Sequence, residues 1–200
     1  LQPFMLPAKI ILQDLTRENC GWDDELDEKF TRRWNVWYEH LDGLKEISIP
    51  RCYVGLVDLF EVELHTFSDA SSNGYGCVCY LRVRISEEYH VTFVTGKSRV
   101  VPSGKSLTIL RLELTAAVVA ARTAKMVVRE HDVKFNRIFF WTDSTTVLRY
   151  LQNETTRFKL FVANRIAIIR ELSSLEQWRY VDTKCHPADA FSRGSVACET

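Results

Sequence analysis

The spacing of hydrophobic positions changes near residue 60 of the chain. From residue 30 to residue 41 an apolar residue recurs every three or four positions, and these residues are Phe30, Trp34, Trp37 and Leu41. This spacing predicts a helix from about Glu25 to His40, with Asp23–Asp24 at its start and Asp42–Gly43 at its end. We interpret its aromatic residues as core packing; the alternative is a platform on which bases stack.

After residue 60 the apolar positions alternate with polar ones, which is typical of strands. The pattern predicts strands at residues 62–67, 77–85 and 90–95, joined by turns at Ser71–Gly74 and Ser86–Glu88. We expect these three strands to form an antiparallel meander. Residues 96–105 follow as a predicted loop.

Helical and strand patterns then alternate to the end of the chain. Helices are expected at residues 109–131, 144–152, 160–172 and 186–193, with a buried parallel strand at 137–142 and another strand at 178–181. The order β-β-β-α-β-α-α-β-α predicts an α/β (mixed α+β) fold with a five-stranded mixed sheet and helices on its faces. We therefore divide the chain into a helical segment, residues 1–60, and an α/β domain, residues 61–200.

Composition and charge limit the classes of function. The 200 residues include 26 Lys and Arg and 26 Asp and Glu, so the formal net charge is zero and bulk positive charge does not hold nucleic acid. The longest apolar run, Ala116–Ala121, is too short to cross a membrane. The six cysteines form no CxxC pair, which favours reduced thiols in an intracellular protein over a zinc site. Because the chain opens on Leu1 without a signal peptide, we expect it to be a piece of a longer polypeptide.

Four acidic residues stand where the predicted fold can bring them together: Asp69, Glu113, Asp143 and Asp189. Taken singly, they have ordinary explanations as a turn residue, an exposed helix residue, a helix cap and a surface charge. In a sheet of this order, however, the first and fourth strands can lie side by side, so Asp69 and Asp143 emerge at adjacent strand ends. The long helix can then offer Glu113, and the closing helix can offer Asp189.

Four carboxylates at one point repel one another and need cations. Carboxylate oxygens suit Mg²⁺ or Mn²⁺, and two such ions ~4 Å apart are the usual means of phosphodiester hydrolysis. The sequence therefore predicts a two-metal site.

Several motifs carry a family resemblance. They are Phe67-Ser68-Asp69-Ala70-Ser71 with Gly74-Tyr75-Gly76, Arg111-Leu112-Glu113-Leu114, Trp141-Thr142-Asp143-Ser144, and Pro187-Ala188-Asp189-Ala190-Phe191-Ser192-Arg193-Gly194. In this order they resemble the ribonuclease H domains of retroelements, and the last resembles the N-P-A-D-x-x-S-R-G ending of BEL/Pao retrotransposon polyproteins. Residues 1–60 look like the connection segment between reverse transcriptase and ribonuclease H in that group, on the motifs Ala8–Gln13, Gly21–Asp24 and Ile47–Arg51.

The resemblance implies a ribonuclease H-like fold and cleavage of the RNA strand of RNA–DNA hybrids during reverse transcription. By position, Asp69, Glu113, Asp143 and Asp189 would bind two Mg²⁺ or Mn²⁺ ions. Expected partners are the hybrid and the reverse transcriptase and integrase regions of the same polyprotein, with no membrane. The expected compartment is the cytoplasm, in a retroelement particle, or the nucleus.

The sequence departs from the family pattern at one place, because Cys185-His186 stands where Asp-Asn is usual. His186 is a candidate for the catalytic role that a histidine before the last aspartate has in many ribonucleases H, assisting product release; otherwise it is a loop histidine. Aspartic-peptidase chemistry is excluded because Asp-Thr/Ser-Gly does not occur. Candidate contacts to phosphates and 2′-hydroxyls are Ser71, Ser72, Asn73, Lys97, Arg99, Lys105 and Arg111.

Two alternatives to a hybrid ribonuclease stay open on the sequence alone. One is a related nuclease of the same superfamily that acts on DNA, and the other is a catalytically silent or co-opted fragment that binds nucleic acid or acts as a spacer.

Overall fold

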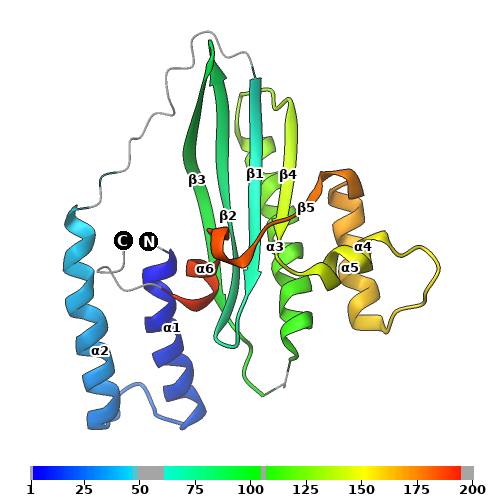
Figure 1. Cartoon of the computed structure of the whole chain (residues 1–200). Coiled ribbons are helices and arrows are strands. Elements are labelled where there is room, and N and C mark those ends of the chain that lie inside the picture. Colours follow the sequence, from blue (N-terminus) through cyan, green and yellow to red (C-terminus); the bar gives the residue numbers. More distant parts are fainter. Residues whose placement is uncertain (1, 47, 49–60, 105–106, 195–200) are drawn as a thin grey trace.

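The computed structural model describes residues 2–46, 48, 61–104 and 107–194. A five-stranded mixed sheet forms its centre, in the order β3-β2-β1-β4-β5 (Figure 1). The strands are β1 (Glu61–Ala70), β2 (Gly74–Ile85), β3 (Glu88–Val100), β4 (Arg137–Thr142) and β5 (Trp178–Tyr180). The predicted fold class and the order of elements after residue 60 are confirmed.

The first three strands form the predicted antiparallel meander, whereas β4 pairs with β1 in parallel. The pairing of Phe67 with Trp141 ends this parallel ladder, two residues before Asp69 and Asp143 respectively. Because parallel neighbours end at the same edge of a sheet, the two strands deliver both aspartates to one edge.

Four helices follow the meander: α3 (Ile109–Glu130), α4 (Thr145–Gln152), α5 (Leu160–Leu172) and α6 (Asp189–Arg193). The longest, α3, packs on β1 and β2 with its alanines buried, as at Ala116 and Ala120. Ser144 caps α4, as expected, by accepting the Val147 N–H at 3.3 Å. Short 3₁₀ turns precede β5 (Leu175–Gln177) and α6 (Thr183–Cys185).

The opposite face of the sheet receives α6, whose Phe191 packs with Val78 and Ala188. Two glycines make this close approach possible. A Cβ at Gly96 would lie 2.1 Å from the Phe191 ring, and one at Gly76 would lie 3.2 Å from the Phe191 carbonyl oxygen. The sheet is thus shaped to accept the short helix that carries Asp189.

Strand β3 is longer than the sequence pattern indicates. Residues 96–100, predicted as the start of a loop, continue the strand because they pair with Gly74–Val78 of β2. The prediction of a loop from residue 96 is therefore wrong for this part. Lys105 lies outside the described residues.

The N-terminal segment holds two helices, α1 (Gln2–Arg17) and α2 (Glu28–His40). Residues 1–60 were predicted to be helical, but no bounds were predicted for a helix at the position of α1. The cap of α2 is Asp27, not Asp23–Asp24, and the chain continues beyond His40 as a 3₁₀ turn through Gly43 to Glu46. Residues 49–60, which contain the predicted domain boundary, lie outside the described residues.

Of the aromatic residues on α2, Phe30 is buried while Trp34 is 37% exposed. Helix α1 lies against β3 and against α6, so α6 is held between α1 and the sheet (Figure 1).

Candidate metal centre

Asp69 and Asp143 meet at the shared edge of β1 and β4, together with His186. One carboxylate oxygen from each aspartate and one ring nitrogen of His186 all lie within 4.8 Å of one another. Three ionisable side chains from distant parts of the sequence thus converge on one point, in the arrangement that the order of strands predicts for the two aspartates.

Asp69 is buried, and its surroundings favour the protonated acid. Burial raises the pKa of its carboxyl, the carboxylates of Asp143 and Asp189 raise it further, and the Ser192 hydroxyl and His186 oppose the rise. The Ser192 Oγ donates a hydrogen bond to Oδ2 of Asp69. No Lys or Arg among the described residues forms a salt bridge with Asp69. A bound metal ion would therefore offset the repulsion between its carboxylate and those of Asp143 and Asp189.

Asp143 is half-buried and receives a hydrogen bond from a second hydroxyl. Thr183 Oγ1 donates to Oδ2 of Asp143 at 2.8 Å. Thr183 belongs to the short turn that follows β5, so the two ends of this contact are 40 residues apart in the chain.

Glu113 lies near the start of α3 and faces the same cluster. Burial raises the pKa of its carboxyl, the hydroxyl of Ser144 lowers it by hydrogen bonding, and the negative charges of Asp143 and Asp69 raise it. Glu113 is therefore close enough to feel both aspartates, although it does not belong to the group whose ligand atoms lie within 4.8 Å.

Asp189 lies at the first position of α6, and its side chain is 39% exposed. Its Oδ1 accepts a hydrogen bond from Arg193 Nε at 2.5 Å, one helical turn later. The negative charge of Asp189 contributes to the raised pKa of Asp69, so Asp189 lies within electrostatic reach of the cluster, at its margin.

His186 is 5% exposed and is fixed in orientation by the backbone. Its Nδ1 accepts the N–H of Ala188 at 3.2 Å, so in the neutral ring the proton resides on Nε2. Nε2 is buried and has no hydrogen-bond partner among the described residues. A protonated nitrogen is a donor and not a metal ligand, so the carboxylates remain the candidate metal ligands. Oxygen ligands of this kind fit Mg²⁺ or Mn²⁺.

The candidate substrate contacts are spread over several elements. Ser72 and Asn73 are exposed in the turn after β1, beside the aspartate cluster, whereas the Ser71 hydroxyl donates to the Ser192 carbonyl at 2.7 Å and so ties that turn to α6. Lys97 and Arg99 lie on the edge strand β3, opposite Cys77 and Tyr75.

Ser98, between those two basic residues, pairs with Gly76 of β2, which in turn pairs with Asp69 of β1, so the three residues share one face of the sheet. Because side chains alternate along a strand, Lys97 and Arg99 project from the face opposite to that of Asp69. The Arg111 guanidinium lies 5.2 Å from the centre of the Phe161 ring on α5. The structure thus brings the turn residues, and not Lys97 or Arg99, next to the acidic cluster.

The two hydroxyls that contact the aspartates were not among the predicted site residues. Ser192 carried a signal, since it lies three residues after Asp189 and therefore on the same side of a helix. Thr183 carried none, because only the folded chain brings it to Asp143.

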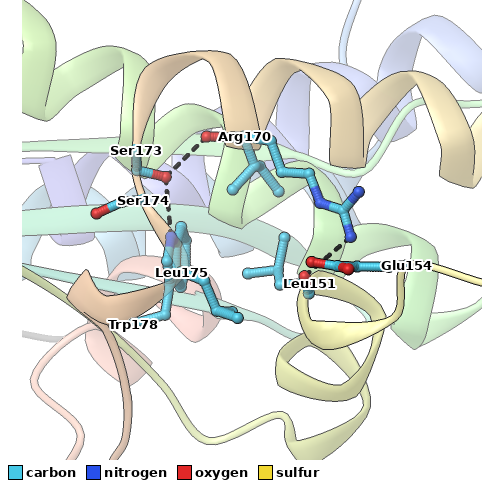
Figure 2. A pocket seen from close by; sticks show the side chains of 8 residues that line it. Leu151, Glu154, Arg170, Ser173, Ser174, Leu175 and Trp178 are labelled. Atoms are coloured by element: carbon cyan, nitrogen blue, oxygen red, sulfur yellow. Dashed lines mark hydrogen bonds between the residues drawn. The ribbon is translucent and has the colours of Figure 1, made fainter.

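A separate cavity of about 240 Å³ lies between α4, α5 and β5 (Figure 2). Its polar groups are used internally: Arg170 donates to the carbonyl oxygens of Leu151 and Asn153 at the end of α4, and Trp178 Nε1 donates to Ser173 Oγ at 2.9 Å. None of the predicted site residues lines this cavity. Because the hydrogen-bonding groups of this cavity are used to connect α4, α5 and β5, we propose no ligand or reaction for it.

Comparisons with known proteins agree with the motifs. A family model described as Pao retrotransposon-like RNaseH-like domain matches residues 1–144. No curated protein matches the chain. No helix in the described residues is both long and apolar enough to span a membrane.

Solved structures of ribonucleases H are similar to the chain at low identity. Ribonuclease H1 from the archaeon Halobacterium salinarum is 16% identical with a TM-score of 0.40, over 61% of this chain and 87% of that one. LC11 ribonuclease H1, solved with an RNA/DNA hybrid, is 11% identical with a TM-score of 0.44, over 68% and 96%. A foamy viral protease-reverse transcriptase, solved with double-stranded DNA, is 12% identical with a TM-score of 0.40, over 88% of this chain and 35% of that one.

Proposed function

The chain belongs to the Pao retrotransposon family of ribonuclease H-like domains, and from that premise we propose that it hydrolyses the RNA strand of RNA–DNA hybrids during reverse transcription. The observation that carries the proposal is the convergence of Asp69 and Asp143 at the shared edge of β1 and β4. Glu113 and Asp189 complete the proposed ligand set.

The electrostatics of the site support a role in binding cations. The pKa values of Asp69 and Glu113 are raised, first by burial and then by neighbouring carboxylates, so the folded chain pays for holding these groups ionised. Two bound Mg²⁺ or Mn²⁺ ions would supply an activated water and stabilise the leaving 3′-oxygen. The carboxylates of Asp69 and Asp143 would hold the ions at the strand ends, where the exposed turn Ser71–Asn73 can contact the hybrid.

His186 has the chemistry of a donor in this proposal. Its Nε2–H has no partner among the described residues, so it is the ring group left to donate to an oxygen of the substrate phosphate or of a water that reaches it, because Nδ1 already accepts from Ala188. This contact is consistent with a part in catalysis or product release.

The remaining proposals concern substrate and partners. Ser72, Asn73, Lys105 and Arg111 are proposed to contact the hybrid. Ser71 is proposed to hold the turn against α6 instead, and Lys97 and Arg99 lie on the face of the sheet opposite to Asp69. Since the net charge is zero, we expect weak affinity for the hybrid in the isolated chain. The reverse transcriptase and integrase regions of the same polyprotein are the proposed neighbours, in a cytoplasmic retroelement particle or the nucleus.

The test is cleavage of a labelled RNA–DNA hybrid in Mg²⁺ and in Mn²⁺. We expect only the RNA strand to be cut, and we expect Asp69→Asn and Asp143→Asn to reduce cleavage to the level seen in EDTA. Asp132→Asn is the matched control, because Asp132 is exposed in the loop between α3 and β4.

Cleavage of duplex DNA instead would indicate the DNA-acting alternative. No cleavage by the folded chain, with or without its polymerase region, would contradict the proposal and favour a silent module.

A further inference from the structure

The segment from Asp182 to Arg193 passes over the ends of β1 and β4 and brings one hydroxyl to each aspartate. Thr183 Oγ1 donates to Oδ2 of Asp143, and Ser192 Oγ donates to Oδ2 of Asp69. No hydrogen bond within the described residues uses Oδ1 of either aspartate. Each carboxylate therefore has one oxygen engaged by the protein and one left over.

We propose that Thr183 and Ser192 are positioning residues, which hold Asp143 and Asp69 by one oxygen each and so present the other oxygen to the metal ions. The inference rests on the proposed function, because it assigns these hydroxyls to the ligands of the proposed metal site. It concerns residues that the family resemblance did not mark as functional.

The physical need for such contacts follows from the geometry of the cluster. The terminal torsion of an aspartate is broad, so an isolated carboxylate turns easily. Asp69 and Asp143 also repel each other, which favours rotation of the two groups away from the shared point. A hydrogen bond to a charged acceptor is roughly twice as strong as one between neutral groups, so each hydroxyl can fix the orientation that binding requires.

Local structure does not explain the Thr183 contact. The turn Thr183–Cys185 already has its own cap, since Asp182 Oδ1 accepts the Lys184 N–H at 2.9 Å. Thr183 is exposed, so its hydroxyl could equally be satisfied by water. Its bond to Asp143 is therefore not required to build the turn, and a role at the carboxylate is the remaining use.

Ser192 is fully buried, and its hydroxyl has two acceptors within reach. Besides Asp69, the carbonyl oxygen of Asp189 lies 3.0 Å from Ser192 Oγ. The hydroxyl has one proton, and the ionised carboxylate is the stronger acceptor. Ser192 thus links the helix that carries Asp189 to the strand that carries Asp69.

The test measures Mn²⁺ binding to the intact 200-residue chain, by electron paramagnetic resonance, beside hybrid cleavage. We expect Thr183→Val and Ser192→Ala each to raise the Mn²⁺ dissociation constant, and the Mg²⁺ concentration for half-maximal cleavage, about 10- to 100-fold. Thr183→Ser keeps the hydroxyl and should bind Mn²⁺ as the unchanged chain does.

Two controls match the substitutions at a distance from the aspartates. Thr155→Val removes an exposed hydroxyl that bonds to Asn153, and Ser173→Ala removes a half-buried hydroxyl at the end of α5 that bonds to the Ile169 carbonyl. If Thr183→Val and Ser192→Ala are folded and bind Mn²⁺ as these controls do, the proposal is overturned. Thr183→Val decides the matter if Ser192→Ala fails to fold, because Thr183 is exposed.

The two readouts separate the inference from the proposed function. A chain that binds Mn²⁺, loses affinity in both variants and yet cuts no hybrid would support the positioning role and contradict the ribonuclease proposal. A folded chain that binds no Mn²⁺ would overturn both.

Discussion

Two buried carboxylates on β1 lie six residues apart in opposite electrostatic surroundings. Glu63 is 3% exposed and Asp69 is 7% exposed. Glu63 accepts from Arg82 Nη1 at 2.7 Å and pairs with His65 Nε2 at 3.0 Å, whereas Asp69 has a hydroxyl and further carboxylates around it. The charge of Glu63 is thus balanced by Arg82 and His65, whereas the charge of Asp69 is proposed to be balanced by a bound metal ion.

This difference predicts opposite directions of pKa. Burial alone would raise the pKa of Glu63, but hydrogen bonds from His65 and Arg82 outweigh it and hold the pKa below its ordinary value of 4.5. A lowered pKa means that Glu63 contributes stability above pH 4.5, and that this stability is lost as the pH falls through the lowered value.

We therefore expect Glu63→Gln to reduce the free energy of unfolding at pH 7 by about 1–3 kcal/mol, and by less below pH 4. Urea denaturation at both pH values measures the difference. Glu88→Gln, on the exposed edge strand, is the control and should change little at either pH. An equal loss from Glu63→Gln at pH 7 and at low pH would contradict the assignment.

Individual residues of the candidate site differ in how far they could be predicted from the sequence. The four carboxylates could be proposed as one site because each stands at a strand end or helix start within a recognisable motif. Their hydroxyl partners could not, since Thr183 and Asp143 have no relation in the sequence. The burial of His186 was equally hidden, because a histidine beside a proline is typical of a loop.

At the scale of elements, the docking of α6 depends on glycine positions in the sheet. The Phe191 ring occupies the space that a side chain at residue 96 would need. Since α6 carries both Asp189 and Ser192, the width of this space decides where two site residues lie.

We expect Gly96→Ala to lower the free energy of unfolding by about 1–3 kcal/mol, because the added methyl displaces the Phe191 ring. Metal-dependent cleavage should fall as well, since α6 shifts. Phe191→Leu in the same chain should recover part of the loss, so a double-mutant cycle is the measurement. Additive losses, or full stability of Gly96→Ala alone, would show that the two residues do not compete for space.

The sheet was the most predictable set of elements, because alternation along Cys77–Ile85 and the apolar block Ile138–Trp141 identify an antiparallel and a buried parallel strand. The bounds of helix α1 were not predicted within the helical segment, because Pro7 stands inside it. Proline disfavours a helix interior, and here the burial of Leu6 and Ile11 against the rest of the molecule outweighs that preference.

At the scale of the whole molecule, the N-terminal segment is packed onto the sheet domain. Leu6 is fully buried, and its Cδ2 would lie 3.0 Å from a Cβ at Gly74, where β2 begins. Lys9 and Gln13 donate to the carbonyl oxygens of Ser98 and Val101 at 3.2 and 2.6 Å. The family model also runs without a break from residue 1 to residue 144.

These contacts predict that α1 stabilises the sheet domain. We expect Leu6→Ala to cost about 2–5 kcal/mol of unfolding free energy, in a single transition seen by both far-UV circular dichroism and tryptophan fluorescence. Leu12→Ala is the control on the same helix, because Leu12 is 51% exposed, and it should cost far less. Two separate transitions in the unchanged chain would mean that α1 and the sheet unfold independently.

The contact between the ends of the described chain has a consequence for synthesis. A Cβ at Gly194 would lie 3.2 Å from the ring of Pro7, so the segment after α6 contacts α1, which was made much earlier. On the ribosome, the strands that carry Asp69 and Asp143 emerge well before Thr183, Asp189 and Ser192. A nascent chain can therefore form the part of the sheet from β1 to β4 while the proposed metal centre is still incomplete, and the segment after β5 both contacts α1 and completes that centre.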